Sequence, residues 1–128
     1  MSTNDVFALA SRQASWLLAR QAAVAQNVAN ANTPGYKATD MAPFEANLQQ
    51  SALQLAVTSP GHMSLGGDPA AQAAADKTAA DDGETAYSGN NVSLEQEMMK
   101  AGEVARAYSL NTAVVKSFNS MILQAAKG

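Results

Sequence analysis

The chain has 128 residues and a net charge of -3, it contains no Cys, and 47% of its residues are hydrophobic although only 5% are aromatic. This length supports one domain with a modest core, and the shortage of aromatic residues favours close packing of helices over a bulky globular core. The absence of Cys excludes disulfides, thiolate catalysis and Cys-type zinc sites, and the lack of any basic cluster argues against a duplex-binding protein.

Residues 4–31 are predicted to form one long helix, because the segment has no Pro or Gly and is rich in Ala, Leu, Gln and Arg. Ser2 followed by Asp5 fits a loose capping box at its start. Residues that recur at alternating steps of three and four predict a heptad seam for a partner helix: Phe7, Ala10, Ala14, Leu17, Gln21, Val24, Val28 and Ala31.

The stretch of residues 27–37 is predicted to end this helix and to bend the chain. Asn30 or Asn32 is expected to end the helix in the left-handed conformation that Asn tolerates. The Thr-Pro-Gly-Tyr run at residues 33–36 has Pro and Gly at the second and third positions of a turn, which is the type II pattern. Asn27 lies inside the helix, three residues before Asn30, so the two amides share a face and are predicted to hold a neighbouring chain in register.

The middle of the chain, residues 41–92, is predicted to be largely irregular and is acidic, with one Lys and six acidic residues. Residues 43–55 favour a short helix, but the alternating pattern of residues 53–58 equally favours an extended end to this stretch. Residues 59–91 are rich in Gly and Pro and predict loops, with an Ala-rich helical fragment at residues 70–80 that is too short to stand alone.

The last segment is predicted to form a second long helix that begins at Ser93 or Leu94, because Ser93 with Gln96 makes a capping box. It carries two heptad stripes. The first consists of Leu94, Met98, Ala101, Ala105, Tyr108, Thr112, Val115 and Ile122, and the second of Val104, Ala107, Val114, Phe118, Met121 and Ala125. Two stripes favour packing against other copies as well as against the N-terminal helix, although one wide stripe inside a monomeric bundle explains the pattern equally well.

Together these elements predict a mainly α fold in which long N-terminal and C-terminal helices pack as a coiled-coil-like pair. A largely irregular middle segment, with either one short helix or a hairpin, joins them. Residues 1–40, 41–92 and 93–128 are expected to make up one domain together.

No sequence pattern indicates catalytic chemistry, a cofactor site or a metal site. His62 is the only His, and one His rarely makes a zinc site. Residues 81–84, Asp-Asp-Gly-Glu, lack the ligand spacing of a calcium loop. Arg12 and Arg20 flank Trp16 at four-residue steps, either as an exposed cation–π cluster or, as we favour, as an anchor against another subunit.

Two motifs resemble the signatures of flagellar rod and hook proteins. Residues 30–37, Asn-Ala-Asn-Thr-Pro-Gly-Tyr-Lys, are similar to the Asn-rich helix end and Thr-Pro-Gly-Tyr turn of these families. Residues 89–98 resemble the start of their C-terminal helix, with Ser88 in place of the usual Asp. A weaker feature is His62, four residues after Thr58. Because only about sixty residues separate the two predicted helices, the chain most resembles the short proximal rod proteins of the flagellar basal body.

This resemblance implies a structural subunit of the proximal rod that assembles helically through its terminal helices, helps to transmit torque from motor to hook and is required for motility. It implies a place in the periplasmic rod after export without a cleaved signal peptide, and the first residues carry no basic leader. The implied partners are other copies of the chain, other rod proteins and the export-gate adaptor, with no nucleic acid and no small-molecule substrate.

The motifs and the heptad stripes together supply a set of candidate subunit-interface and family-motif residues. These are Asn27, Asn30, Asn32, Thr33, Pro34, Gly35, Tyr36, Lys37, Asn90, Asn91, Val92, Leu94, Met98, Val104, Tyr108, Val115, Phe118 and Ile122. The alternative hypothesis is a soluble helical adaptor or chaperone that binds a partner helix through the same seams. An adaptor should be ordered alone, whereas a rod subunit should have frayed termini until it polymerises.

Overall fold

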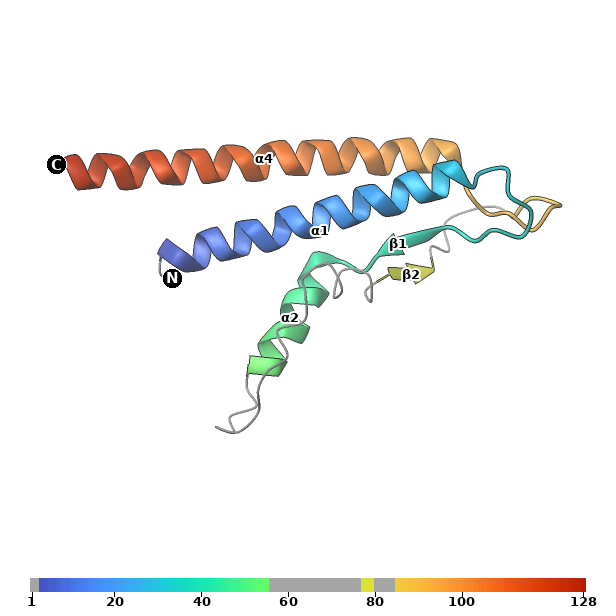
Figure 1. The fold of residues 1–128 in the computed structure, drawn as a ribbon, viewed down its shortest axis with the longest axis horizontal. Helices are drawn as coiled ribbons and strands as arrows, with labels where there is room; N and C mark the ends of the chain where they lie inside the picture. The colour runs from blue at the N-terminus through green and yellow to red at the C-terminus, as the bar shows by residue number, and fades with distance from the viewer. Residues whose placement is uncertain (1–2, 56–76, 80–84) are drawn as a thin grey trace.

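The computed structural model describes residues 3–55, 77–79 and 85–128, and two long helices dominate it (Figure 1). The elements in chain order are α1 (Thr3–Ala29), β1 (Thr39–Met41), α2 (Phe44–Leu55), β2 (Lys77–Ala79) and α4 (Leu94–Lys127). α1 and α4 lie side by side and run in opposite directions. The predicted mainly helical fold, with paired terminal helices and a less regular middle, is confirmed. Within the described residues, no helix combines the length and the apolarity that a membrane crossing requires.

The two long helices pack through small and medium-sized side chains, as the composition predicted. The buried apolar residues of the two helices are Ala10, Leu17, Ala23 and Val24 on α1 and Val104 on α4. Near the start of α1 the rings of Phe7 and Phe118 meet edge-on, with centroids 5.5 Å apart. The side-chain amide of Asn111 donates a hydrogen bond to the carbonyl of Ala10 at 3.1 Å. The result is a narrow seam in place of a thick core.

The predicted end of α1 and the predicted cap at the start of α4 both need a correction. α1 ends at Ala29, two residues early, because residues 30–32 already form a turn. Among the described residues only glycines have positive φ, so neither Asn30 nor Asn32 ends the helix in the left-handed conformation. α4 begins at Leu94 as predicted, but the Ser93 hydroxyl makes no capping hydrogen bond; the Ser93 carbonyl accepts from the N–H of Glu97 at 3.0 Å.

The middle segment contains more regular secondary structure than predicted. α2 is helical through Leu55, so the extended alternative is wrong for residues 53–55. β1 and β2, which the sequence analysis missed, form a two-stranded antiparallel sheet in which Thr39 pairs with Ala79. The helical fragment is therefore wrong at residues 77–79, where the backbone pairs with β1 instead. Residues 56–76, with His62, and 80–84 lie outside the described residues.

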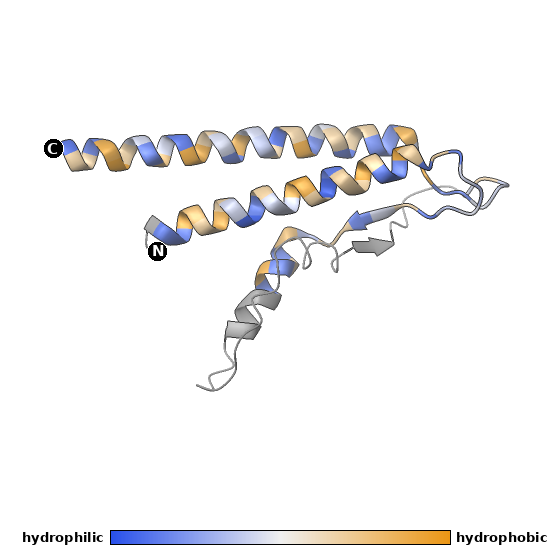
Figure 2. Ribbon diagram, in the orientation of Figure 1, coloured by the Kyte–Doolittle hydropathy of each residue, from blue (hydrophilic) through white to orange (hydrophobic). Residues whose placement is uncertain are grey.

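α4 is longer than α1, with 34 residues against 27, and its C-terminal end projects past the N-terminal end of α1 (Figure 1). Hydrophobic residues continue into this projecting part (Figure 2). Met121 and Leu123 there are 56% and 53% exposed. α4 therefore offers apolar side chains along a length that α1 does not match.

Candidate assembly surface

The predicted turn at residues 33–36 is present at one end of the helix pair. The backbone N–H of Tyr36 donates to the carbonyl of Thr33 at 3.2 Å, and Gly35 has φ +73°. A positive φ at the third position is what a type II turn requires, and Gly adopts it without steric cost. The turn thus brings the chain back from α1 towards β1.

The two motifs singled out in the sequence lie against each other at this end. The backbone N–H of Gly35 donates to the carbonyl of Ser88 at 2.9 Å. Gly89 also has a positive φ, +79°, and a Cβ added to it would lie 3.4 Å from the Cα of Gly35. The sequence analysis treated residues 30–37 and 89–98 as separate signatures, whereas the structure makes them the two halves of one junction.

Asn90 binds the turn that follows α1. Its side-chain NH2 group lies 2.8–3.0 Å from the carbonyl oxygens of Asn30, Ala31 and Thr33, and its carboxamide oxygen accepts from the N–H of Val92 at 2.8 Å. The residue is 5% exposed. Asn90 thus holds the turn after α1 from a distant segment of the chain, whereas we predicted a local Asn cap on the helix itself.

Asn27 is fully buried, and both ends of its amide are used inside the chain. Its Nδ2 donates to the carbonyl of Thr39 at 2.7 Å. Its Oδ1 accepts from the N–H of Thr39 at 3.0 Å and from the hydroxyl of Tyr36 at 3.1 Å. With 0% exposure, Asn27 has no surface to offer a second subunit. The structure therefore replaces its predicted place on a subunit interface with a role in fastening β1 to α1.

The other Asn residues of the motifs differ in burial and in their hydrogen bonds. Asn91 accepts a hydrogen bond from the N–H of Ala38 at 2.7 Å. Asn30 donates to the carbonyl of Gln26 at 2.8 Å and is half-buried. Asn32, with Thr33, Pro34 and Lys37, is exposed. A contact between Asn30 or Asn32 and another subunit stays a prediction.

The predicted interface residues of α4 face different ways. Val104 is buried against α1, Phe118 is half-buried against Phe7, and Val115 and Ile122 are half-buried. Three members of the first stripe are exposed instead: Leu94 (51%), Met98 (74%) and Tyr108 (44%). α1 thus covers parts of both stripes, and it leaves one side of α4 with exposed apolar residues.

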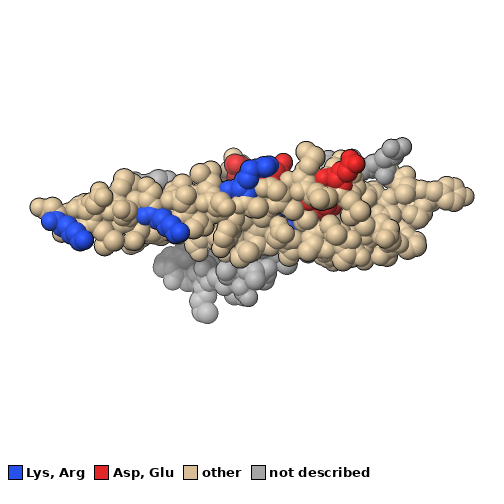
Figure 3. Space-filling model, turned by 90° about the horizontal axis from the view of Figure 1, so that it is seen from above, with Lys and Arg blue, Asp and Glu red and all other residues tan. Residues whose placement is uncertain are grey.

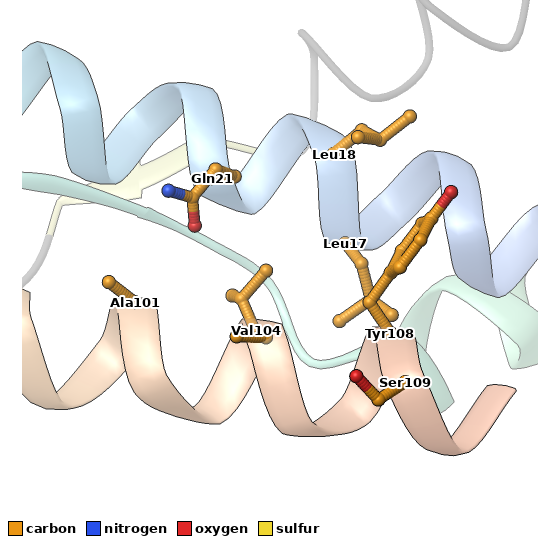
Figure 4. Close-up of a pocket in the computed structure, with 8 residues that line it drawn as sticks. Leu17, Leu18, Gln21, Ala101, Val104, Tyr108 and Ser109 are labelled. Atoms are coloured by element: carbon orange, nitrogen blue, oxygen red, sulfur yellow. The ribbon is translucent and has the colours of Figure 1, made fainter. Parts of the chain in front are cut away.

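A groove runs along that side, between α1 and α4 (Figure 4). It encloses about 380 Å³ and is lined by Leu17, Leu18, Gln21, Ala101, Val104, Ala105, Tyr108 and Ser109. In Figure 4 the side chains of Leu17, Val104 and Tyr108 gather between the helices, while Leu18 points away from α4. All eight lining residues are uncharged. The groove can therefore accept apolar side chains.

Comparison with known proteins agrees with this geometry. Residues 10–37 match the family described as flagella basal body rod protein. The flagellar basal body rod protein FlgB of Agrobacterium fabrum is 43% identical over 129 aligned residues, which cover 99% of this chain and 96% of that protein. The chain belongs to the flagellar basal body rod protein family. This family consists of structural proteins of the flagellum and is not a class of enzymes.

The family match at residues 10–37 covers most of α1 together with the turn, and it ends where β1 is about to begin. The rod protein's other motif, at residues 89–98, lies far away in sequence but completes the same junction through Asn90. The Asn-Asn pair at residues 90 and 91 was visible in the sequence. Its contact with the end of α1 was not, because helix and strand periodicity carry no information about contacts between distant segments.

A charged cluster beside the rod protein's helix seam was missed in the sequence. Arg20 binds both carboxylate oxygens of Asp40, at 3.1 and 3.3 Å. Lys100 lies 3.4 Å from Asp40 and 3.4 Å from Glu97, and Arg20 also reaches Glu103 at 3.4 Å. Glu97 is only 2% exposed, and its Oε2 has no hydrogen-bond partner among the described residues. These ion pairs fasten the β1 segment to both long helices.

The cluster shifts two pKa values. Burial alone would raise the pKa of Asp40, but hydrogen bonds from Arg20 and the Met41 N–H, with the charges of Arg20 and Lys100, bring it below its ordinary value. Burial alone would lower the pKa of Arg20, but Asp40 and Glu103 raise it. Both groups therefore stay charged at neutral pH.

Trp16 is an anchor within the rod protein, and the contact with another subunit that we favoured stays a prediction. Its indole N–H donates to the carbonyl of Ala42 at 2.8 Å, and its ring packs against Phe44 at 5.9 Å between centroids. The Arg20 guanidinium lies 5.6 Å from the ring centroid, so the cation–π alternative is right for this Arg. Arg12 is exposed. Trp16 thereby sets the position of α2 against α1.

Metal chemistry has no support in the part of the chain that the structure describes. No group of three or more His, Cys, Asp or Glu side chains is placed to hold an ion there. The charged cluster contains two cations within its ion pairs, which satisfy its carboxylates in part.

Proposed function

We propose that this rod protein is a subunit of the proximal rod that assembles helically through its terminal helices. The observation that carries the proposal is the 43% identity to FlgB over nearly the whole length of both chains. The exposed apolar residues of α4 support it, because contiguous exposed apolar side chains mark protein interaction sites in soluble proteins. A helix that meets α1 on one side and other subunits on the remaining sides suits a tubular assembly.

The same proposal includes the finer expectations drawn from the resemblance. The subunit is exported without a cleaved signal peptide, takes its place in the periplasmic part of the basal body and helps to transmit torque from motor to hook. Its neighbours are further copies of the chain, other rod proteins and the export-gate adaptor. A chain without Cys is compatible with passage between compartments of different redox potential.

Gene deletion with complementation tests this function. We expect the deletion strain to lack rods and to lose swimming, and the intact gene to restore both, with rods scored by electron microscopy of isolated basal bodies. Asn32→Ala and Asn27→Ala provide a comparison. Only Asn27→Ala should disturb the fold, because Asn27 is buried and Asn32 is exposed. A deletion strain that builds complete rods and swims would disprove the proposal.

A further inference from the structure

α4 has a second exposed apolar face besides the one at the groove. Four large side chains on it are more than two-fifths exposed: Met99 (68%), Leu110 (66%), Val114 (49%) and Met121 (56%). Steps of eleven, four and seven residues place them on one face of a helix with 3.6 residues per turn. We call these four residues the ridge.

The ridge and the groove lie on different sides of α4. Ala101, Ala105 and Ser109 follow one another at four-residue steps and line the groove. Val114 is nine residues from Ala105, which is two and a half turns and therefore the opposite side of the helix. α1 occupies the side between them, where Val104 is buried. One chain thus carries a row of small residues in a hollow and, across the same helix, a row of large projecting residues.

The charges of the two faces are compatible with contact between them. The groove lining holds no charged residue, and α4 between Arg106 and Lys116, where Leu110 and Val114 lie, holds none either. Seen from above α4, most of the surface is uncharged, with two separate basic side chains towards one end and a basic side chain beside acidic ones near the middle (Figure 3). When Val114 of one copy lies beside Ala105 of another in parallel, Arg106 of the first comes within one turn of Glu95 of the second. Both are exposed and of opposite sign.

The groove is also continuous with the helix seam of the chain itself. Leu17 and Val104 line it, and these two residues are 2% and 6% exposed in the seam. A helix seated there extends an existing apolar interface and does not start a new one. Small residues at four-residue steps allow a second helix to approach closely, because large side chains on it then fill the hollow.

We propose that the ridge of one copy packs into the groove of the next copy, side by side and in parallel. This inference rests on the proposed function and names the contact between like subunits within it. Because two different faces meet, the contact is heterologous, and its repetition produces a ring or an open helix, not a closed two-fold dimer. It gives α4 one intramolecular neighbour and two intermolecular ones, which accounts for both heptad stripes.

Pairs of introduced cysteines test this contact without background, since the chain has no Cys. The variant carries Ala105→Cys in the groove and Val114→Cys on the ridge, on opposite sides of one helix and too far apart to pair within a chain. It is produced in the deletion strain, and swimming cells are oxidised and analysed by denaturing electrophoresis. We expect a ladder of cross-linked multimers of this chain, and only monomer from either single variant.

The matched control replaces Val114→Cys with Ala113→Cys, also exposed but about 100° further round the helix, and it should give no ladder. A dimer from Ala105→Cys alone would show a two-fold contact and overturn the proposal. So would swimming cells whose double variant forms no cross-link, or one only to a different protein. In those cases the proposed function would still stand, whereas failure of the unaltered gene to restore swimming would remove the function itself.

A second pair of variants tests the contact between ridge and groove if the cysteine variant does not swim. Leu110→Glu places a charge on the ridge, and Ala113→Glu places the same charge beside it on the exposed surface. We expect Leu110→Glu to abolish rod formation and swimming while the purified chain keeps its helical circular dichroism. Ala113→Glu should swim normally. Normal rods with Leu110→Glu would contradict the proposal.

Discussion

At the scale of single residues, Asn90 matters most for the junction because its NH2 group lies within hydrogen-bond distance of three carbonyls of another segment. Asn90→Ala should lower the free energy of unfolding by about 1–3 kcal/mol, since these part-buried carbonyls lose the hydrogen bonds of the buried amide. Asn32→Ala, on the exposed side of the same turn, should change it by less than about 0.5 kcal/mol. Urea denaturation followed by circular dichroism compares the two, and equal effects would refute this role of Asn90.

Two glycines provide a test in which the same substitution has opposite signs. Gly89→Ala puts a side chain at φ +79° and against the backbone of Gly35, so it should destabilise the protein by about 1–2 kcal/mol or more. Gly102→Ala lies inside α4, where the added Cβ meets only the end of the Arg106 side chain at 3.9 Å. It should stabilise the protein by about 0.5–1 kcal/mol. Thermal unfolding of both variants shows whether each one is less or more stable than the unaltered protein.

Asp40 should make the stability of the protein fall in acid. Its pKa is lowered in the folded state, so the stabilisation is complete above the unfolded value of about 3.9 and is lost as the pH falls through the folded value. Asp40→Asn should be less stable at neutral pH, and its stability should depend less on pH below about 4. Urea midpoints measured from pH 7 down to pH 3 check this. Parallel curves for the two proteins would show that Asp40 is not responsible.

At the scale of elements, the two long helices are a stable scaffold only where they meet. Phe118→Ala removes the edge-on contact with Phe7 and should cost about 1–3 kcal/mol, less than a fully buried Phe. Met121→Ala, three residues further along α4 and 56% exposed, should leave the stability of the isolated chain almost unchanged. It should instead weaken assembly. A comparison of denaturation midpoints with rod yield separates the two effects.

The elements also show how far the sequence could be interpreted. The turn at residues 33–36, the start of α4 at Leu94 and the helical α2 all depend on local signals, so each could be predicted. β1 and β2 could not, since three residues carry too little periodicity to be recognised and their partners are far apart in the chain. The same limit hid the role of Asn90 and the ion pairs of Asp40.

The candidate assembly surface was predicted in outline and revised in detail. Leu94, Met98 and Tyr108 of the first stripe are exposed, so this part of the stripe is not covered by α1. Asn27 was placed on the interface because its position next to the seam was read from the helix alone. β1, which covers it, was not foreseen. A polar residue inside a helix can bind a neighbouring chain or a distant part of its own, and helix geometry does not distinguish these cases.

At the scale of the whole molecule, the chain is long, narrow and unevenly packed. The described contacts between α1 and α4 reach Phe118, and beyond it α4 projects past the start of α1 (Figure 1). In the isolated chain, amides of residues 119–127 should therefore exchange with solvent much faster than those of residues 97–107. Hydrogen exchange with mass spectrometry measures this. Strong protection along the full length of α4 in a monomer would favour the adaptor hypothesis.

The position of Asn90 also sets the order in which parts of the chain can complete their folded contacts. Sixty residues separate it from Asn30, whose carbonyl it binds. Whatever delivers the chain from its N-terminus, the ribosome included, presents α1 first, and the turn after α1 lacks the hydrogen bonds of Asn90 until residue 90 has followed. The packing of α4 against α1 must form later still, because Val104 and Phe118 come later in the chain. The subunit is thus built so that no early part of it can finish folding before most of the chain has emerged.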